Sequence, residues 1–420
     1  MGEKKYFYDI HCHAFNLSHP NLMAFARRIN LHTYLFLNAV PGLSTALSPF
    51  LAGKIDRLMN LLSIMENDLG TYFLLMEQDA AALLTDGKLK IGNYVYDKII
   101  LTPLIMDFGC KEVEKFPNIH YSQLPQKPIA EQVFDLFYGI RDYSEYALVK
   151  DAAGELDYRR VKKEEKLFEI YPFLGINTQL YEMAEIEKLL GKYFGGYHRD
   201  HAELYGKMGA FKNDVDTMDS NFFAGIKVYP PLGFDPWPED GKEREKVEYL
   251  YRFCLARKIS ITSHCSDGGF VTTDRAGEFA SPKRWKEVLE RHPDLRLNLA
   301  HFGRQGKKFW LFENCEWMND ILGLIGTNEN VYTDFSYRGV DPGYYDDLRK
   351  LIEEQKDREF REKLKKRILF GSDFMINLLE IDSYAGYLNQ YAKAGNGDPG
   401  FNDDKNLFCS TNPERFLFGL

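Results

Sequence analysis

Short apolar runs that alternate with amphipathic helical segments are the feature that most constrains the fold of this chain. Eight runs rich in β-branched and aromatic residues each end in polar or small residues, at 6–13, 98–108, 168–177, 223–231, 259–269, 295–303, 330–337 and 367–375. Segments with helical spacing separate the later runs, at 243–258, 281–293, 317–328 and 343–366. Strands that alternate with helices favour a parallel sheet, so the pattern predicts an α/β protein with a TIM-like (β/α)8 barrel.

The length of the chain implies that this barrel carries insertions. A plain (β/α)8 barrel needs about 250 residues, and the chain has 420. Two stretches depart from the regular alternation, at about 14–95 and 109–219, the second of which contains the third predicted strand. We therefore expect a single barrel domain over residues 1–420, with mainly helical insertions after strands 1 to 3. In such a barrel the loops that follow the strands build the active-site face.

Composition and charge narrow the range of partners. The net charge is −9 and no run of Lys and Arg forms a basic stripe, so the sequence does not favour nucleic-acid binding. The six Cys are far apart and show no Cys-x-x-Cys pair, which favours reduced thiols. No signal peptide and no membrane-spanning run is visible. We expect a cytoplasmic protein that acts on a small molecule, without a membrane or nucleic-acid partner, and a homo-oligomer stays open.

Two histidines separated by one residue stand at the end of the first predicted strand. Side chains at i and i+2 of a strand point to the same face, so His11 and His13 converge there. Two imidazoles on one face can share a cation. The alternative is a surface His-x-His near an N-terminus, and the rest of the chain decides between the two.

The ends of the later strands carry further residues of this kind, namely Lys227, His264, His301 and Asp373. The carboxyl ends of parallel strands meet at one mouth of a barrel, where the fold keeps its chemistry. Neutral imidazoles and a carboxylate suit a borderline divalent metal such as zinc, which activates water and polarises a carbonyl. The aspartate can also take a proton from that water. Taken singly, each histidine fits a hydrogen-bonding role, and Asp373 fits a helix N-cap.

The order of these residues resembles the amidohydrolase superfamily. More narrowly, it resembles the amidohydrolase-related branch, which includes aminocarboxymuconate-semialdehyde decarboxylase and related metal-dependent hydrolases. Three stretches resemble motifs of that branch: GIKVYPPLGFDP (225–236), LFGSDF (369–374) and NPERFLFGL (412–420). The resemblance runs from residue 6 to the end of the chain and leaves the insertions largely uncovered.

The resemblance implies a ligand set for one divalent metal, most often zinc with manganese as the alternative: His11, His13, His264 and Asp373. His301 would hydrogen-bond or polarise the metal-bound water, or act as an acid or base. In two-metal members a carboxylated lysine bridges the ions and the two later histidines bind the second metal. Lys227 and His301 would then also be ligands. A single metal is favoured, because the branch that the chain most resembles looks mononuclear.

Four residues at the mouth are candidates for substrate binding: Lys227, Tyr229, Arg304 and Arg338. Lys227 either pairs with a carboxylate or binds an anionic substrate. Arg304 and Arg338 follow strands six and seven and can hold a substrate carboxylate bidentately, or form loop salt bridges. Tyr337 and Asp334 lie beside the end of strand seven and are weaker candidates.

The sequence therefore predicts an enzyme, a metal-dependent hydrolase of small molecules in which Asp373 and His301 are catalytic. A metal-activated water attacks the carbonyl carbon of an amide, ester or lactone, and Asp373 carries the proton to the leaving group. One alternative keeps the site and changes the reaction to a metal-dependent, non-oxidative decarboxylation of an unsaturated or aromatic carboxylic acid. Another is a catalytically silent barrel used for binding.

Overall fold

The computed structural model describes residues 4–20, 48–109, 127–150, 154–306, 315–395 and 398–419. Two parts of the predicted insertions, at 21–47 and 110–126, lie outside the described residues. The statements below concern the described ranges.

All eight predicted strands are present, and nearly every residue in them is buried. They are β1 (Tyr6–Cys12), β5 (Lys98–Pro103), β8 (Phe168–Ile170) continued by β9 (Phe173–Gly175), β10 (Gly225–Val228), β11 (Ser260–Ser263), β12 (Leu297–Leu299), β13 (Val331–Asp334) and β14 (Ile368–Leu369). Neighbouring strands of this set pair in parallel. Burial on both faces explains why these runs are continuously apolar and do not alternate.

The strands follow one another around a TIM-like (β/α)8 barrel. One sheet has the order β1-β5-β8 and the other the order β9-β10-β11-β12-β13-β14. The third strand joins the two sheets because its first half, β8, pairs with β5 and its second half, β9, pairs with β10. Pro172, which lacks an N–H donor, lies between the halves. The predicted fold class is therefore confirmed.

No strand ladder joins β14 to β1 in the described residues, and single backbone hydrogen bonds hold this seam. The Ile10 N–H donates to the Phe370 carbonyl at 3.2 Å, and the Asp373 N–H donates to the His11 carbonyl at 2.7 Å. The seam thus connects the first strand of the chain to the last one. It also joins the backbones of two residues that the sequence predicts as metal ligands.

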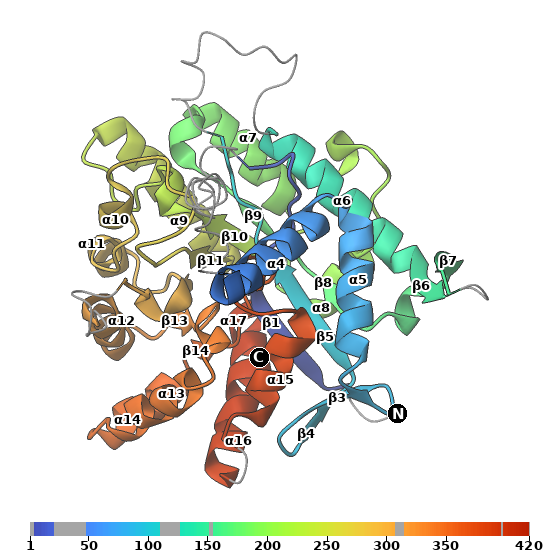
Figure 1. Ribbon diagram of the computed structural model, residues 1–420. Coiled ribbons are helices and arrows are strands. Elements are labelled where there is room, and N and C mark those ends of the chain that lie inside the picture. The colour runs from blue at the N-terminus through green and yellow to red at the C-terminus, as the bar shows by residue number, and fades with distance from the viewer. Residues whose placement is uncertain are drawn as a thin grey trace.

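The C-terminal segment packs across this seam, where it lies beside β1 and β14 in Figure 1. It consists of the π-helical turn η9 (Leu407–Thr411) and α17 (Asn412–Phe418). The Ser410 hydroxyl donates to the Tyr6 carbonyl at 2.8 Å, and the Asn412 side-chain amide donates to the Ile368 carbonyl at 2.8 Å. The final motif of the sequence therefore braces both strands of the seam.

Helices connect the later strands, as the sequence predicts. They are α9 (Gly241–Arg257), α10 (Ala276–Phe279), α11 (Arg284–Arg291), α12 (Glu316–Thr327), α13 (Tyr344–Glu353) and α14 (Arg358–Lys365). Two more helices, α15 (Tyr384–Lys393) and α16 (Pro399–Asn406), follow the last strand. Helix α9 begins where the Asp240 carboxylate accepts hydrogen bonds from two backbone N–H groups of the first turn. None of the helices in the described ranges is long and apolar enough to cross a membrane.

The first insertion is partly helical and contains one feature that the sequence pattern did not predict. Helices α4 (Ser48–Met65) and α5 (Leu69–Ala81) fit the prediction. They are followed by an antiparallel sheet of β2 (Leu84–Thr85), β3 (Lys88–Ile91) and β4 (Tyr94–Tyr96), a non-helical part of the predicted, mainly helical insertion. This sheet packs on α15 and α16, where the Tyr96 hydroxyl donates to the Asn406 side chain at 2.9 Å.

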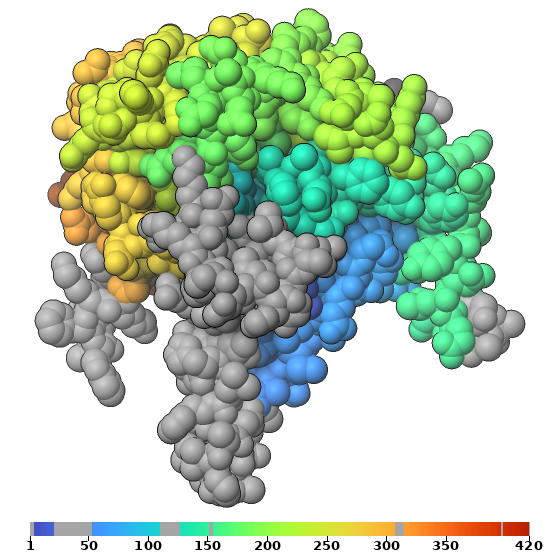
Figure 2. Space-filling model, turned by 90° about the horizontal axis from the view of Figure 1, so that it is seen from above, coloured from blue at the N-terminus to red at the C-terminus, as the bar shows by residue number. Residues whose placement is uncertain are grey.

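The second insertion is also mainly helical. It contains α6 (Ile129–Glu145), α7 (Met183–Phe194) and α8 (His201–Lys207). Helix α6 packs against α5 of the first insertion. A hairpin of β6 (Tyr146–Lys150) and β7 (Leu156–Arg160) projects from the molecular surface beside α5 (Figures 1 and 2). That residues 1–420 form one domain stays a prediction.

A buried carboxyl group follows β5 and ties the second strand to the third. Asp107 accepts hydrogen bonds from the Tyr181 hydroxyl at 2.6 Å and from the Asn177 and Gly109 N–H groups at 3.3 Å. Burial outweighs these bonds and raises the pKa of Asp107 to about 6. The native protein therefore holds this proton at pH values where an unfolded aspartic acid, with a pKa of about 3.9, has lost it.

We predict that Asp107 makes the free energy of unfolding fall as the pH rises through about 6. The stabilising contribution is complete below the unfolded pKa and is lost above the native one. Asp107→Asn should remove a pH dependence of about 3 kcal/mol. Urea unfolding of both proteins at pH 4 and pH 7.5, with a chelator present, measures it. Equal pH dependence in the two proteins would contradict this assignment.

Candidate metal centre

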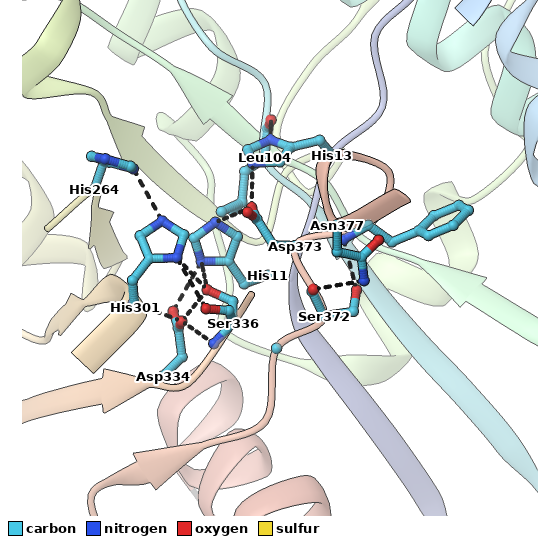
Figure 3. Close-up of polar contacts among 12 residues, drawn as sticks. His11, His13, Leu104, His264, His301, Asp334, Ser336, Ser372, Asp373 and Asn377 are labelled. Atoms are coloured by element: carbon cyan, nitrogen blue, oxygen red, sulfur yellow. Dashed lines mark hydrogen bonds and ion pairs between the residues drawn. The ribbon is translucent and has the colours of Figure 1, made fainter. Parts of the chain in front are cut away.

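Six predicted site residues meet at the carboxyl end of the barrel. His11 and His13 end β1, Lys227 lies on β10, and the others follow β11, β12 and β14: His264, His301 and Asp373. All six side chains are buried. Figure 3 shows His11, His13 and Asp373 in one group, with His301 beside them and His264 beyond His301.

Three of these residues form a group that can hold a metal ion. One ligand atom each of His11, His13 and Asp373 lies within 4.8 Å of the other two. The Asp373 Oδ1 atom is 3.0 Å from His13 Nε2 and 3.4 Å from His11 Nε2. His11 Nε2 is buried and has no hydrogen-bond partner among the residues that the structure describes. A buried nitrogen left in this way fits a ligand position better than a structural one.

The far side of each ring shows which nitrogen carries the proton. His13 Nδ1 lies 3.2 Å from the Leu104 carbonyl, and His11 Nδ1 lies 3.0 Å from Asp334 Oδ2. Carbonyl and carboxylate oxygens accept hydrogen bonds, so Nδ1 of each ring is a donor. The neutral His11 ring then has its lone pair at Nε2, on the inner side, whereas His13 Nε2 lies at hydrogen-bond distance from Asp373 Oδ1, 3.0 Å. Such an arrangement of nitrogen and oxygen donors suits a divalent metal such as zinc.

His264 and His301 form a second pair of facing nitrogens. His264 Nδ1 lies 3.0 Å from His301 Nε2. Their outer nitrogens contact carbonyl oxygens, at 3.0 Å for Gly268 and 3.2 Å for Ser336, so these outer atoms carry the protons. Burial lowers the pKa of both rings, that of His301 to about 3, which keeps them neutral. The two inner nitrogens lie at hydrogen-bond distance, which two lone pairs alone do not satisfy, and His264 is not in a three-residue metal group of the described chain.

Lys227 is the sixth residue and is an unusual buried amine. Its Nζ has no hydrogen-bond partner in the described residues, and the side chain is 1% exposed. Burial lowers the pKa of Lys227 to about 8, although Asp334 and Asp373 oppose that shift. The ring of Tyr229 lies 5.6 Å from Nζ. The amine is thus held beside the histidines without a hydrogen bond or an ion pair to a carboxylate in the described residues.

Asp334 and Ser336 are the functional residues that the sequence pattern underrated or missed. Asp334 ends β13 and forms a second candidate metal group with His11 and His301. Burial alone would raise the pKa of Asp334, but its contacts with His11, His301 and Ser336 hold it well below its usual value. Its place at a strand end was a signal for Asp334. No sequence signal identified Ser336.

The backbone around the centre is strained at several points. His301, Tyr337 and Asp373 have φ values of 62°, 65° and 61°, which residues other than glycine rarely adopt. Gly371 allows a close approach, because a Cβ atom there would lie 2.7 Å from the His11 Cβ and 3.0 Å from the Ser336 Cβ. The glycine of the LFGSDF motif therefore lets the last strand pack against the first metal-ligand candidate.

The centre opens into a cavity of about 340 Å³, whose lining includes Tyr229, Phe270, Arg304 and Tyr337. The Arg304 guanidinium lies over the Tyr337 ring at 4.6 Å and has no carboxylate partner in the described residues. Arg338 does not line this cavity and lies over Tyr344 at 4.9 Å. The structure thus separates two arginines that the sequence treats alike. On the other side, the rings of Phe15, Phe108 and Phe270 pack together 5.5–5.8 Å apart.

The second half of the chain matches a known protein family. The family described as Amidohydrolase matches residues 209–419, which include the last five barrel strands and four of the six site residues, from Lys227 to Asp373. No curated protein matches the sequence. The match does not distinguish the narrower branch of aminocarboxymuconate-semialdehyde decarboxylase, which stays a prediction.

Three solved structures illustrate the range of similar folds. An uncharacterised TIM-barrel protein from Bordetella bronchiseptica has 14% identity, covers 98% of each chain and has a TM-score of 0.44. A probable 2-pyrone-4,6-dicarboxylic acid hydrolase from Acinetobacter baumannii has 10% identity, 99% coverage of each and a TM-score of 0.43. A 4-oxalomesaconate hydratase from Rhodopseudomonas palustris has 12% identity, covers 98% of this chain and 95% of its own, and has a TM-score of 0.41.

Proposed function

Because the chain belongs to the amidohydrolase family and is an enzyme of that family, we propose that it is a metal-dependent hydrolase of a small-molecule amide, ester or lactone. One observation carries this proposal: His11 Nε2, His13 Nε2 and Asp373 Oδ1 converge in a buried site, with a hydrogen-bond acceptor behind each ring at Nδ1. These three residues would hold one divalent metal, zinc first and manganese as the alternative, with His264 as a further ligand. When bound, the metal would supply an activated water and polarise the substrate carbonyl.

Asp373 and His301 are the residues to which we assign proton transfer. Burial alone would raise the pKa of Asp373, but the hydrogen bond with His13 and the neighbouring rings of His301 and His11 outweigh it and lower that pKa, so the carboxylate is ionised. It can therefore take a proton from the attacking water and pass it to the leaving group. His301 is neutral and presents the lone pair of Nε2 to the site, so it accepts a hydrogen bond or a proton there.

The outer cavity supplies groups that would bind and orient the substrate. Arg304 lies at the cavity wall without an ion-pair partner in the described chain, so it can hold a substrate carboxylate bidentately. Tyr229 lines the same cavity, and Lys227 lies beneath it. Arg338 is a weaker candidate, because it does not line the cavity. A cytoplasmic location and a homo-oligomer remain predictions from the sequence.

Two further readings use the same site. A non-oxidative decarboxylation of an unsaturated or aromatic acid is favoured by the positive charges of Lys227 and Arg304 near the centre. A second metal is favoured by the facing inner nitrogens of His264 and His301, with Lys227 as the carboxylated bridge. We retain the single metal as the main proposal. His11, His13 and Asp373 place two inward-facing ring nitrogens and an ionised carboxylate within 4.8 Å of one another, which suits one ion.

Turnover and metal binding are tested by separate substitutions, at Asp373 and at His11. Asp373→Asn should lower the hydrolysis rate by about 10²–10⁴-fold, because the amide cannot take up the proton. His11→Ala should lower the metal content. Hydrolysis of p-nitrophenyl acetate and of a panel of lactones and amides measures the rate, and elemental analysis measures the metal. Asp107→Asn is the matched control, because Asp107 is also a buried carboxyl group but makes its hydrogen bonds to Tyr181, Asn177 and Gly109. Full turnover of Asp373→Asn would exclude it as the proton carrier.

The metal count is tested at Lys227. If the site holds one ion, Lys227→Ala should keep one equivalent of metal per chain, because the lysine is then no ligand. If the lysine bridges two ions, the wild type should hold two equivalents and the variant should lose one. Elemental analysis of both proteins, prepared with bicarbonate and zinc present, distinguishes the two cases. Loss of a second equivalent would contradict the single-metal proposal.

The role of Arg304 is tested against Arg338. Arg304→Met should raise the KM of a carboxylate-bearing substrate by about 10–100-fold, because a charged, bidentate hydrogen bond is lost. The KM of the matched neutral ester should stay as in the wild type. Arg338→Met should leave both values unchanged. Equal effects of the two substitutions on the carboxylate-bearing substrate would argue against Arg304 as its anchor.

A further inference from the structure

His11 and His301 share one hydrogen-bond partner on the side that faces away from the cavity. The Ser336 hydroxyl oxygen lies 3.1 Å from His11 Nδ1 and 2.9 Å from His301 Nδ1. The same hydroxyl donates its proton to Asp334 Oδ1. Figure 3 shows Asp334 and Ser336 together beneath the two rings. One short segment at the end of β13 thus contacts two histidines, one 325 and the other 35 positions from Ser336 in the chain.

Counting protons fixes the tautomer of both rings. A hydroxyl group has a single proton, and that of Ser336 is donated to the Asp334 carboxylate. The hydroxyl oxygen can therefore only accept from the two Nδ1 atoms. The neighbouring acceptors agree, because His11 Nδ1 also faces Asp334 Oδ2 at 3.0 Å and His301 Nδ1 also faces the Ser336 carbonyl at 3.2 Å. Both rings are then protonated at Nδ1 and turn the lone pair of Nε2 inward.

Asp334 itself has no lone pair left for a metal. Its Oδ1 accepts from the Ser336 hydroxyl and from two backbone N–H groups, those of His301 at 3.1 Å and Ser336 at 3.0 Å. Its Oδ2 accepts from His11 Nδ1 and from the Asn298 amide at 2.7 Å. The side chain is fully buried. Five donors therefore occupy the lone pairs of the two carboxylate oxygens. Asp334 is close enough to His11 and His301 to share a metal with them, but it has no acceptor position left for one.

We infer that Asp334 and Ser336 form one positioning unit that sets the tautomer and the orientation of His11 and His301 together. The unit prepares His11 Nε2 as a metal ligand and His301 Nε2 as an acceptor, so neutral His301 does not donate a proton to the substrate. The ligand part of this inference rests on the proposed function. The tautomer part rests only on the hydrogen bonds of the protein.

The tautomers are measured first, on metal-free protein at pH 7.5. Histidine labelled with ¹⁵N distinguishes Nδ1–H from Nε2–H by its NMR shifts, with His11→Gln and His301→Gln used for assignment. The wild type should show Nδ1–H in both rings. Asp334→Asn should introduce the Nε2–H form in His11 and His301, and Ser336→Ala should shift the signals of both rings in the same direction. An Nε2–H form in the wild type, or unchanged signals in both variants, would overturn the inference.

Zinc affinity is measured next, by competition with a chromophoric chelator. Asp334→Asn should raise the dissociation constant by about 10–100-fold, as expected for a residue that orients a ligand. Thr333→Val is the matched control, because the Thr333 hydroxyl is also buried on β13 but donates to the Leu299 carbonyl at 2.6 Å. It should lower stability and leave the zinc affinity and the tautomers unchanged.

The outcomes separate the possible failures. Loss of a whole zinc equivalent in Asp334→Asn with unchanged tautomers would make Asp334 a ligand and overturn its positioning role. If Asp334→Asn does not fold, Ser336→Ala decides, because it removes only the shared hydroxyl. If wild-type protein binds no zinc, the proposed function fails, while the NMR result on metal-free protein still decides whether the unit sets the tautomers.

Discussion

The convergence of buried lone pairs at the carboxyl end of the barrel is the constraint on which the rest of the site depends. Polar atoms taken out of water are costly unless something pairs with them. Within the described ranges His11 Nε2 has no hydrogen-bond partner, and His13 Nε2 faces a carboxylate that is itself ionised. The fold maintains this state through acceptors placed behind each ring. The arrangement is understandable if a cation balances it.

The same constraint explains why the weakest seam of the barrel lies where it does. Strands β14 and β1 are joined by single backbone hydrogen bonds, one of them between Asp373 and His11. A ladder extended through this point would hold residues 371–373 in regular strand geometry, whereas Asp373 has a φ of 61°. The C-terminal segment braces the seam from outside. A bound metal would link the first and last strands from inside, so metal binding and stability should be coupled.

The barrel and its mouth could be predicted from the sequence, because buried parallel strands appear as apolar runs and their carboxyl ends necessarily meet. The small sheet β2–β4 and the β6–β7 hairpin could not, since strands of two to five residues give too short an alternation to recognise. Arg304 and Arg338 both follow strands, and only the loop conformations separate them. Ser336 was missed because its contacts, to His11 and His301, join residues 325 and 35 positions away in the chain.

The central claim is that this chain carries a resident divalent metal, and the metal content of the wild-type protein tests it most directly. Untagged protein expressed with zinc and manganese available and purified without chelator would be subjected to elemental analysis. The account predicts about one equivalent of zinc or manganese per chain. A protein that holds no metal, and takes up none when zinc or manganese is added back, would contradict the account, because the inward-facing nitrogens of His11 and His13 would then have no cation to bind.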